Sequence, residues 1–546
     1  MKRLFQRIAV FVVAVAALGF GVDWILDRQR SADRPRLSVA NRLPEDLRRV
    51  AAKVDAEFAA AWTSAGLQPS EPAPALTLHR RLSLALTGTI PSLSELRVVD
   101  GGLGADDGLD AWVRYLLDDP RTADYLAERF ARAFVGTEDG PFILYRRHRL
   151  VSWISDQIRR NRPYDEWVRD LIASTGIWTS RPEVNFVTVT VDNNNKEEGP
   201  DEVRLAARVS RAFLGVRLDC VQCHNDKFGD HWKQTHFHEL AAFFASSEVS
   251  LAGIHDRSDK PYAFRYLGRV EKESVPPRVP FNERLLPADG ALRDRLAAWV
   301  THPENRPFAR MLVNRTWAML FQRPLHPALD SLPLDGPFPP GMETLVDDLV
   351  AHHFDLHRLI RVMAATRPFR VDSRLPAERT EFQPEAQRQF ASFPLTRLRP
   401  EQVAGAILQS ASLKTVGAQS HVLQRVMRHL QERDFVQHYG DAGADEFDVA
   451  AGTISQRLTM MNGNLVKDRT KDDLAMNAAT RIAALAPNDE VAVETAYLTV
   501  LTRRPTSEES RHFTERLGSD KKVSRASHLE DLFWTLINTT EFAWNH

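Results

Sequence analysis

Residues 200–245 read PDEVRLAARVSRAFLGVRLDCVQCHNDKFGDHWKQTHFHELAAFFA. Acidic residues open this stretch, and apolar residues then recur at helical spacing as far as Leu214, which predicts a helix. A second apolar repeat at 236–244 predicts another helix. The short motif CVQCH, residues 220–224, lies between them. The stretch therefore indicates a helical fold in which two helices flank a compact motif.

The same helical spacing recurs through most of the chain, so the fold class is mainly α with few short strands. One segment departs from it, because NFVTVTV at 185–191 alternates as a short strand does. The segments that predict helices are 111–117, 123–134, 153–158, 292–300, 308–321, 345–353, 356–366, 400–410, 491–501 and 529–539.

Length and composition limit the class of protein. A chain of 546 residues with 43% hydrophobic and 26% charged residues is typical of a globular protein with more than one domain. Its 71 Lys and Arg residues nearly balance 72 Asp and Glu residues. Because no net positive field would attract a polyanion, we expect no nucleic-acid partner.

The first thirty residues have the pattern of an export signal. Lys2, Arg3 and Arg7 precede an uncharged apolar run at 8–22. Residues 23–26 extend this run to roughly the length that crosses a bilayer. We therefore expect an N-terminal helix that anchors the protein to the cytoplasmic membrane, facing the periplasm or cell envelope; a removed signal peptide is the alternative.

The chain has two cysteines, Cys220 and Cys223, which excludes a disulfide framework. Their spacing, followed directly by His224, is typical of covalent haem c: the two thiols reach the two vinyl groups, and the imidazole binds the iron. Three other interpretations remain, namely a redox-active cysteine pair, a zinc site that recruits nearby histidines, and a structural motif without a cofactor.

The second iron ligand is less well determined by the sequence. His231 is the first candidate, because a turn of seven residues can fold back across a haem face. His236 and His238 follow, and the iron could also be five-coordinate. In that case Asp226, Lys227 or a downstream histidine could supply a polar group beside an open position.

Several segments together resemble a known family. Residues 213–245 closely resemble the motif block of a planctomycete-type family of secreted cytochrome-like proteins of unknown function. Earlier parts of that domain are similar to LHRRLSLALTGTIPSLSEL at 78–96, YLLDDPRTADYLAERFARAFVG at 115–136 and NRPYDEWVRDLIAS at 161–174. LAAWVTHPENRPFARMLVNRTWAMLFQRPL at 296–325 resembles the opening of the planctomycete-specific domain of unknown function that usually follows.

The resemblance implies an exported, haem-binding protein with a multi-helix cytochrome-like domain followed by a second helical domain. It implies no known reaction. Family members commonly carry a second histidine two residues after the motif histidine, followed by proline. Here these positions hold Asp226 and Lys227. If that histidine binds iron in relatives, this chain uses another ligand or leaves the position open.

The pattern divides the chain into five parts. Two of the divisions are marked by composition. One is a proline-rich stretch at 69–74, and the other is the extended, proline-containing segment after residue 260. The expected parts are a signal anchor or signal peptide at 1–30, a stalk and linker at 31–75, a cytochrome-like haem-binding domain at 76–260, an extended linker at 261–286 and a helical domain at 287–546.

These observations favour an electron-transfer protein of the cell envelope whose partner is a redox protein or a small molecule. A haem-dependent oxidase or peroxidase acting on a small molecule or a saccharide-derived substrate is the second interpretation. A structural envelope protein with a zinc or vestigial site is the third. His352, His353 and His357 share a predicted helix and form a weaker candidate metal site.

Overall fold

The computed structural model describes residues 43–100, 105–137, 145–191, 199–226, 232–257, 260–374, 384–417, 422–440, 447, 452–474, 477–519 and 523–546. These residues are mainly helical with a few short strands, which confirms the predicted fold class. Within the same residues, no helix is both long and apolar enough to cross a membrane. The expected N-terminal anchor lies outside the described residues and stays a prediction.

Three antiparallel strand pairs are present in the described chain. They are β1 (Ser247–Ser250) with β2 (Gly253–Asp256), β3 (Ala263–Phe264) with β4 (Glu273–Ser274), and β5 (Thr396–Arg397) with β6 (Trp544–Asn545). The prediction of a strand at 185–191 is wrong, because this segment begins with a short helix, α9 (Asn185–Thr188). All seven of its residues are buried, so the alternation of Val and Thr does not separate a buried face from an exposed one.

The charged segment expected in the stalk instead contributes a core helix, α2 (Glu45–Ser64). Its apolar residues recur every three or four positions, and Val54, Phe58 and Trp62 are fully enclosed. The Phe58 ring stacks on Trp317 with 5.7 Å between ring centroids. This helix therefore belongs to the body of the protein.

A first apolar core runs from Leu47 to Phe393. It continues across the expected linker at 261–286, because α12 packs on α8, and α13 meets both α3 and α10. The bounds of the two expected domains stay a prediction, but the core does not divide at that linker. Its helices are α3 (Ala75–Thr87), α5 (Ala105–Leu117), α6 (Pro120–Val135), α7 (Arg147–Arg159), α8 (Tyr164–Ala173), α10 (Glu202–Leu214), α12 (Leu292–Val300), α13 (Arg306–Phe321), α14 (Met342–Ala351) and α15 (Leu356–Ala365).

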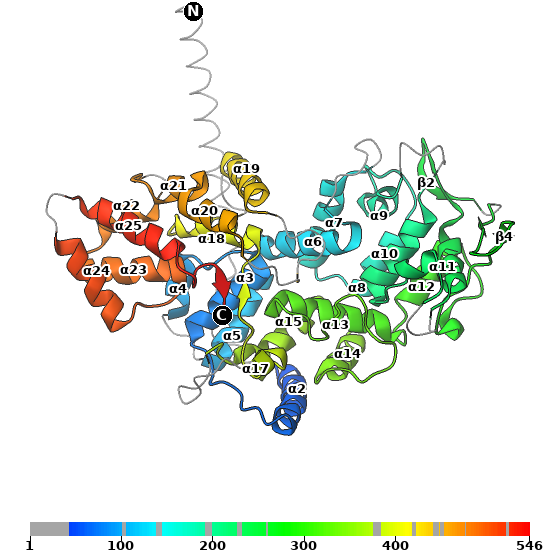
Figure 1. Cartoon of the computed structure of the whole chain (residues 1–546), viewed down its shortest axis with the longest axis horizontal. Coiled ribbons are helices and arrows are strands. Elements are labelled where there is room, and N and C mark those ends of the chain that lie inside the picture. Colours follow the sequence, from blue (N-terminus) through cyan, green and yellow to red (C-terminus); the bar gives the residue numbers. More distant parts are fainter. Residues whose placement is uncertain are drawn as a thin grey trace, which may run out of the picture.

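A second apolar core joins residues from Leu398 to Phe542 with Leu84 and Ile90 from the start of the first core. Figure 1 shows this helical body on the left, in yellow to red, with α3 beside it. Its helices are α18 (Pro400–Ser410), α19 (Val422–Tyr439), α20 (Ile454–Asn462), α21 (Asn464–Thr470), α22 (Ala478–Leu485), α23 (Asp489–Leu501), α24 (Ser507–Ser519) and α25 (Arg525–Ile537).

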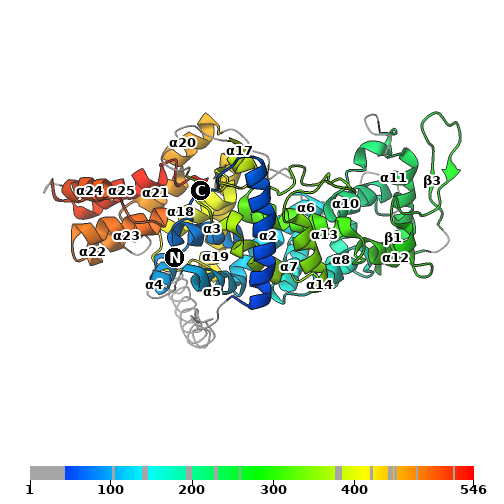
Figure 2. The ribbon, with the colours of Figure 1, turned by 90° about the horizontal axis from the view of Figure 1, so that it is seen from below.

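The remaining elements are short. Figure 2 shows that the strand β3 and the helix α11 lie at the end of the molecule opposite α24. These elements are α4 (Leu93–Asp100), α11 (Gln234–Ala241), α16 (Arg367–Arg370), α17 (Pro384–Arg388) and the 3-10 turns η1 (Pro182–Val184), η2 (Asp219–Gln222), η3 (Ala242–Phe244) and η4 (Glu283–Leu285).

Candidate functional site

The CVQCH motif begins in the 3-10 turn η2, shortly after α10 ends. Asp201 caps the start of α10 by accepting the backbone N–H of Arg204 at 2.9 Å, so the predicted helix start is confirmed. Gly215 ends the helix at φ 62°, a left-handed conformation that glycine adopts without strain. Val221 at the centre of the turn is buried, and its N–H donates to Leu218 O at 3.0 Å. The turn is thus fixed to the core by its central residue.

The two thiols of the motif face solvent on either side of that buried valine. Cys220 and Cys223 are both free and exposed. The half-buried His224 follows them, with its Nδ1 2.7 Å from Asn225 O. Because a carbonyl oxygen only accepts, Nδ1 carries the proton and Nε2 keeps its lone pair. This is the tautomer of a histidine that binds a metal through Nε2.

His238 has a different role. Its side chain is buried; Nε2 lies 3.0 Å from Gln222 O, and Nδ1 lies 2.8 Å from the Tyr262 hydroxyl. The carbonyl requires a proton on Nε2, so Nδ1 accepts from the tyrosine. Burial lowers the pKa of His238, which agrees with a neutral ring. Both nitrogens are occupied, so His238 holds the motif turn in place and is unsuited as the second iron ligand.

Gln234 connects the motif to two other elements. Its Nε2 donates to Gln222 O at 2.9 Å, and its backbone N–H donates to Asn225 Oδ1 at 2.9 Å. Its Oε1 accepts the N–H of Leu267 at 3.1 Å. Gln234 was not among the site residues predicted from the sequence. The signal was its position four residues before His238, which places both side chains on one face of α11.

His236 uses its Nδ1 to accept the backbone N–H of Lys233 at 3.3 Å, which caps α11. That contact places the proton on Nε2, so iron binding through Nε2 requires the other tautomer. Nearby, the Asp226 N–H donates to Trp232 O at 2.9 Å. His231 and Lys227 lie outside the described residues, so the role of His231 as second ligand stays a prediction.

A small aromatic arm, residues 262–275, packs beside α11. The Phe264 ring lies parallel to His238 with 3.4 Å between centroids, and the Tyr266 ring meets His238 edge-on at 5.9 Å. The arm comprises β3, β4 and the connection between them, which we call the tip (265–272). These residues fall in the segment expected to be a linker, yet two of them contact His238, which holds the motif turn in place.

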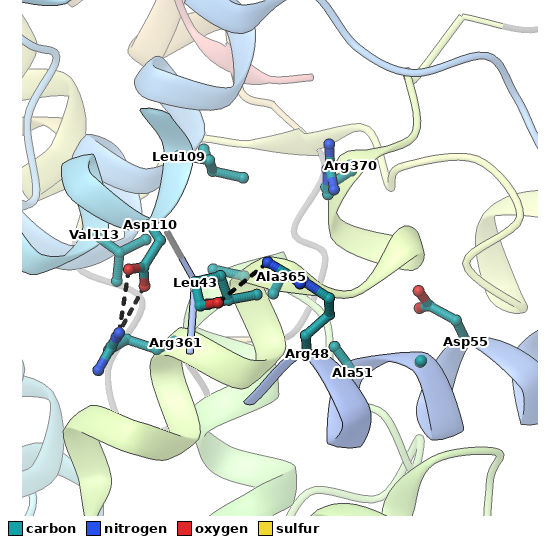
Figure 3. Close-up of a pocket in the computed structure, with 12 residues that line it drawn as sticks. Leu43, Arg48, Ala51, Asp55, Leu109, Asp110, Val113, Arg361, Ala365 and Arg370 are labelled. Atoms are coloured by element: carbon teal, nitrogen blue, oxygen red, sulfur yellow. Dashed lines mark hydrogen bonds and ion pairs between the residues drawn. The ribbon is translucent and has the colours of Figure 1, made fainter. Parts of the chain in front are cut away.

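A second candidate site is a cavity of about 410 Å³ between α2, α5 and α15, drawn in Figure 3. Arg361 is held by Asp110 through contacts of 2.9 and 3.1 Å. Arg48 donates to Leu43 O, and Asp55 accepts the Arg367 N–H at 2.6 Å. These polar groups bind one another or the backbone, so the cavity offers a weaker case for chemistry than the motif turn does.

The three histidines near residue 355 do not share a helix. His352 follows the last residue of α14, His353 has φ 53° in the turn, and His357 lies in α15. Nowhere in the described chain do three His, Cys, Asp or Glu side chains come together so that they could hold a metal ion. The prediction that one helix carries all three histidines is therefore wrong.

Comparison with known families adds a classification to this geometry. Residues 53–249 match the family PSCyt2, described as a protein of unknown function (DUF1549). Residues 292–446 match PSD1, described as a protein of unknown function (DUF1553). The chain thus carries a PSCyt2 domain followed by a PSD1 domain. This order confirms the pair of domains inferred from sequence. No curated protein and no solved structure matches the chain.

The motif turn and α11 lie inside the PSCyt2 match, and the aromatic arm lies between the PSCyt2 and PSD1 matches. The PSD1 match spans helices of both apolar cores. The two sequence families and the two cores thus divide the molecule at different places.

Proposed function

We propose that this PSCyt2–PSD1 protein is an exported c-type haem protein that transfers electrons in the cell envelope. Cys220 and Cys223 would hold the haem through two thioether bonds, and His224 would bind its iron. The observation that carries the proposal is the state of these three side chains. Two exposed, free thiols lie in and directly after one turn, and the next imidazole already donates its Nδ1–H to a carbonyl.

The donor set fits a haem better than it fits zinc. A structural zinc ion needs four ligands, and the described residues bring no three candidate side chains together. Covalent haem attachment needs only two reachable thiols and one imidazole, all of which are on this turn. A haem supplies one-electron chemistry at its iron when it is bound.

The surrounding residues keep the turn in one shape. The carbonyl of Gln222, between the two cysteines, accepts hydrogen bonds from Gln234 and His238. Supporting contacts of this kind hold iron ligands in a fixed orientation and so influence the reduction potential. The basic residues and apolar run at the N-terminus support export and attachment to the membrane. The partner would be a redox protein or a small molecule.

The test is production of the full chain in a host that matures c-type cytochromes. We expect the mass of the polypeptide plus one haem and a Soret band, both abolished in the Cys220→Ser/Cys223→Ser variant. A reduced spectrum that carbon monoxide leaves unchanged supports electron transfer, whereas carbon monoxide binding supports the oxidase or peroxidase alternative. The bare polypeptide mass with two free thiols would overturn haem binding.

A further inference from the structure

The aromatic arm carries apolar side chains whose exposure the fold itself does not explain. Leu267 and Val270, both in the tip, expose 76% and 90% of their surface. Isolated exposed apolar residues are common on proteins. Here, however, the two belong to one short projection, seen at the right-hand end of Figure 2, whose base packs on His238 through Phe264.

We infer, on the basis of the proposed function, that the arm forms one wall of the haem site and that Leu267 and Val270 cover the porphyrin. The contact between Leu267 and the motif is made through a single side chain. Gln234 accepts the Leu267 N–H with Oε1 and donates to Gln222 O with Nε2. The side-chain amide of Gln234 therefore bridges the tip to the turn that carries both thiols.

The base of the arm packs on buried residues, whereas Leu267 and Val270 in its tip stay exposed. At the base, Phe264 stacks on buried His238, and the Val275 N–H donates to Tyr262 O at 2.9 Å. Strands β3 and β4 pair through only two residues each. A wall built in this way has its base packed beside the motif turn and keeps the apolar side chains of its tip available to a flat ligand.

The chemistry of the tip also suits a porphyrin. A haem presents a wide apolar ring and two propionate carboxylates. The tip alternates the two exposed apolar residues with three exposed basic ones, Arg265, Arg269 and Lys272. Glu271 and Glu273 nearly balance these charges, so the arm has no strong net charge that would select a charged protein partner.

Limited trypsin digestion tests this wall, because the basic residues of the tip are cleavage sites. We compare the haem-loaded full chain with the Cys220→Ser/Cys223→Ser chain. Covering the tip should slow its cleavage by about tenfold in the loaded protein, since a protease acts on exposed backbone. Cleavage after exposed Lys414, in the second body, should be unchanged and serves as the internal control.

Equal cleavage of the tip in the two chains, with the haem mass present, would overturn the wall while leaving haem attachment intact. Absence of the haem mass would instead overturn the proposed function, and the wall with it. The two failures are therefore distinguishable.

A second measurement does not depend on proteolysis. The Leu267→Ser/Val270→Ser variant should keep the haem mass but lower the reduction potential, because removing apolar cover exposes the iron site to water. The matched control is Leu485→Ser, which is 75% exposed on α22 and should leave the potential unchanged. An unchanged potential in the tip variant would contradict the inference.

Discussion

At the scale of single residues, three histidines of one segment differ in which ring nitrogen carries the proton. His224 donates from Nδ1 to a carbonyl, His236 accepts at Nδ1 from an amide, and His238 donates from Nε2 to a carbonyl. Only His224 therefore combines a half-exposed ring with a free Nε2 lone pair. The sequence places all three within fifteen residues, but their roles depend on which backbone group each ring meets.

Replacing His238 tests its role in holding the turn. His238→Phe removes one of the two hydrogen bonds to Gln222 O and the partner of the Tyr262 hydroxyl. We expect a loss of about 1–3 kcal/mol in the free energy of unfolding, measured by urea titration, because buried polar groups lose partners. His438→Phe, at a largely exposed position on α19, is the control and should change stability by about 0.5 kcal/mol or less. Equal effects would contradict the assigned role.

His79 makes the stability of the fold depend on pH. Burial against Trp112 lowers its pKa to about 4, below the ordinary value of 6.5. Between these values the unfolded chain binds a proton that the folded chain does not, so stability falls as the pH falls. From pH 7 to pH 5 this group should cost about 2 kcal/mol.

His79→Leu should remove that part of the acid sensitivity, because the leucine cannot bind a proton. Urea unfolding at pH 7 and pH 5, followed by tryptophan fluorescence, measures the difference for each chain. A variant that loses as much stability on acidification as the parent would show that His79 is not responsible.

At the scale of elements, the sequence predicts what depends on local spacing. The helix before the motif and the helix after it were both predicted, because apolar residues repeat on one face of α10 and of α11. The motif residues were predicted for the same reason, since their spacing is local. The aromatic arm was not, because its position depends on stacking between Phe264 and His238 and on Gln234, which the chain brings together from separate segments.

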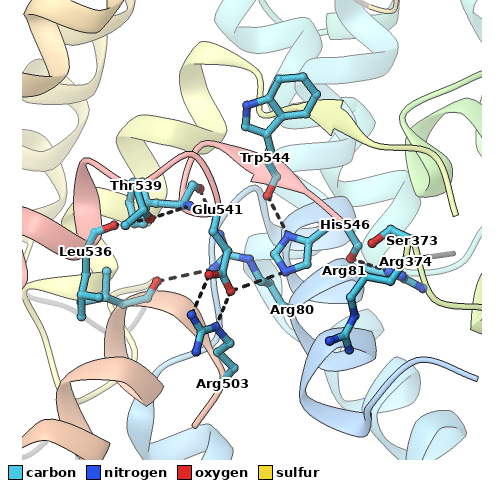
Figure 4. A network of polar contacts seen from close by, with 12 residues as sticks. Arg80, Arg81, Ser373, Arg374, Arg503, Leu536, Thr539, Glu541, Trp544 and His546 are labelled. Atoms are coloured by element: carbon cyan, nitrogen blue, oxygen red, sulfur yellow. Dashed lines mark hydrogen bonds and ion pairs between the residues drawn. The ribbon is translucent and has the colours of Figure 1, made fainter. Parts of the chain in front are cut away.

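The helix α3 shows how a charged residue inside an apolar stretch can serve packing. Within LHRRLSLAL, Arg81 is fully buried and donates to the backbone oxygens of Phe369, Val371 and His546 at 2.7–3.0 Å. Figure 4 shows it near the Arg503–Glu541 ion pair at the end of the second body. The arginine thus ties one helix to two distant segments of chain.

Arg81→Leu should therefore destabilise the protein by about 3–5 kcal/mol, because several buried carbonyl groups lose their donor together. Circular dichroism during thermal unfolding measures the effect. Arg149→Leu replaces an exposed arginine of α7 and should change stability by about 0.5 kcal/mol or less. A similar small change for Arg81 would show that these contacts contribute little.

At the scale of the whole molecule, the two apolar cores are joined through α3 and the turn that follows it. Leu82 belongs to the first core, whereas Leu84 and Ile90 belong to the second. Neighbouring residues of one helix thus pack into both bodies. Arg80 adds a further link, because it donates to Phe542 O at 3.0 Å. We infer that the two bodies stabilise each other and unfold together.

The two bodies also approach each other closely at Gly405 on α18. A Cβ atom added there would lie 2.6 Å from the backbone oxygen of Gly88, which ends α3. Replacing glycine by alanine inside a helix usually stabilises a protein by about 0.5–1 kcal/mol. At Gly405 we expect the opposite sign, a loss of about 1–3 kcal/mol, because backbone on both sides must move apart.

Gly518→Ala is the matched control, since it lies in α24 with nothing within 4 Å of the added carbon. It should be neutral or slightly stabilising in urea titration. If the two bodies unfold together, Gly405→Ala should also speed hydrogen exchange in α8 and α12, which lie far from the substitution. Hydrogen exchange of those helices measures this: faster global exchange supports coupling, whereas a change confined to the second body would show that the two bodies unfold independently.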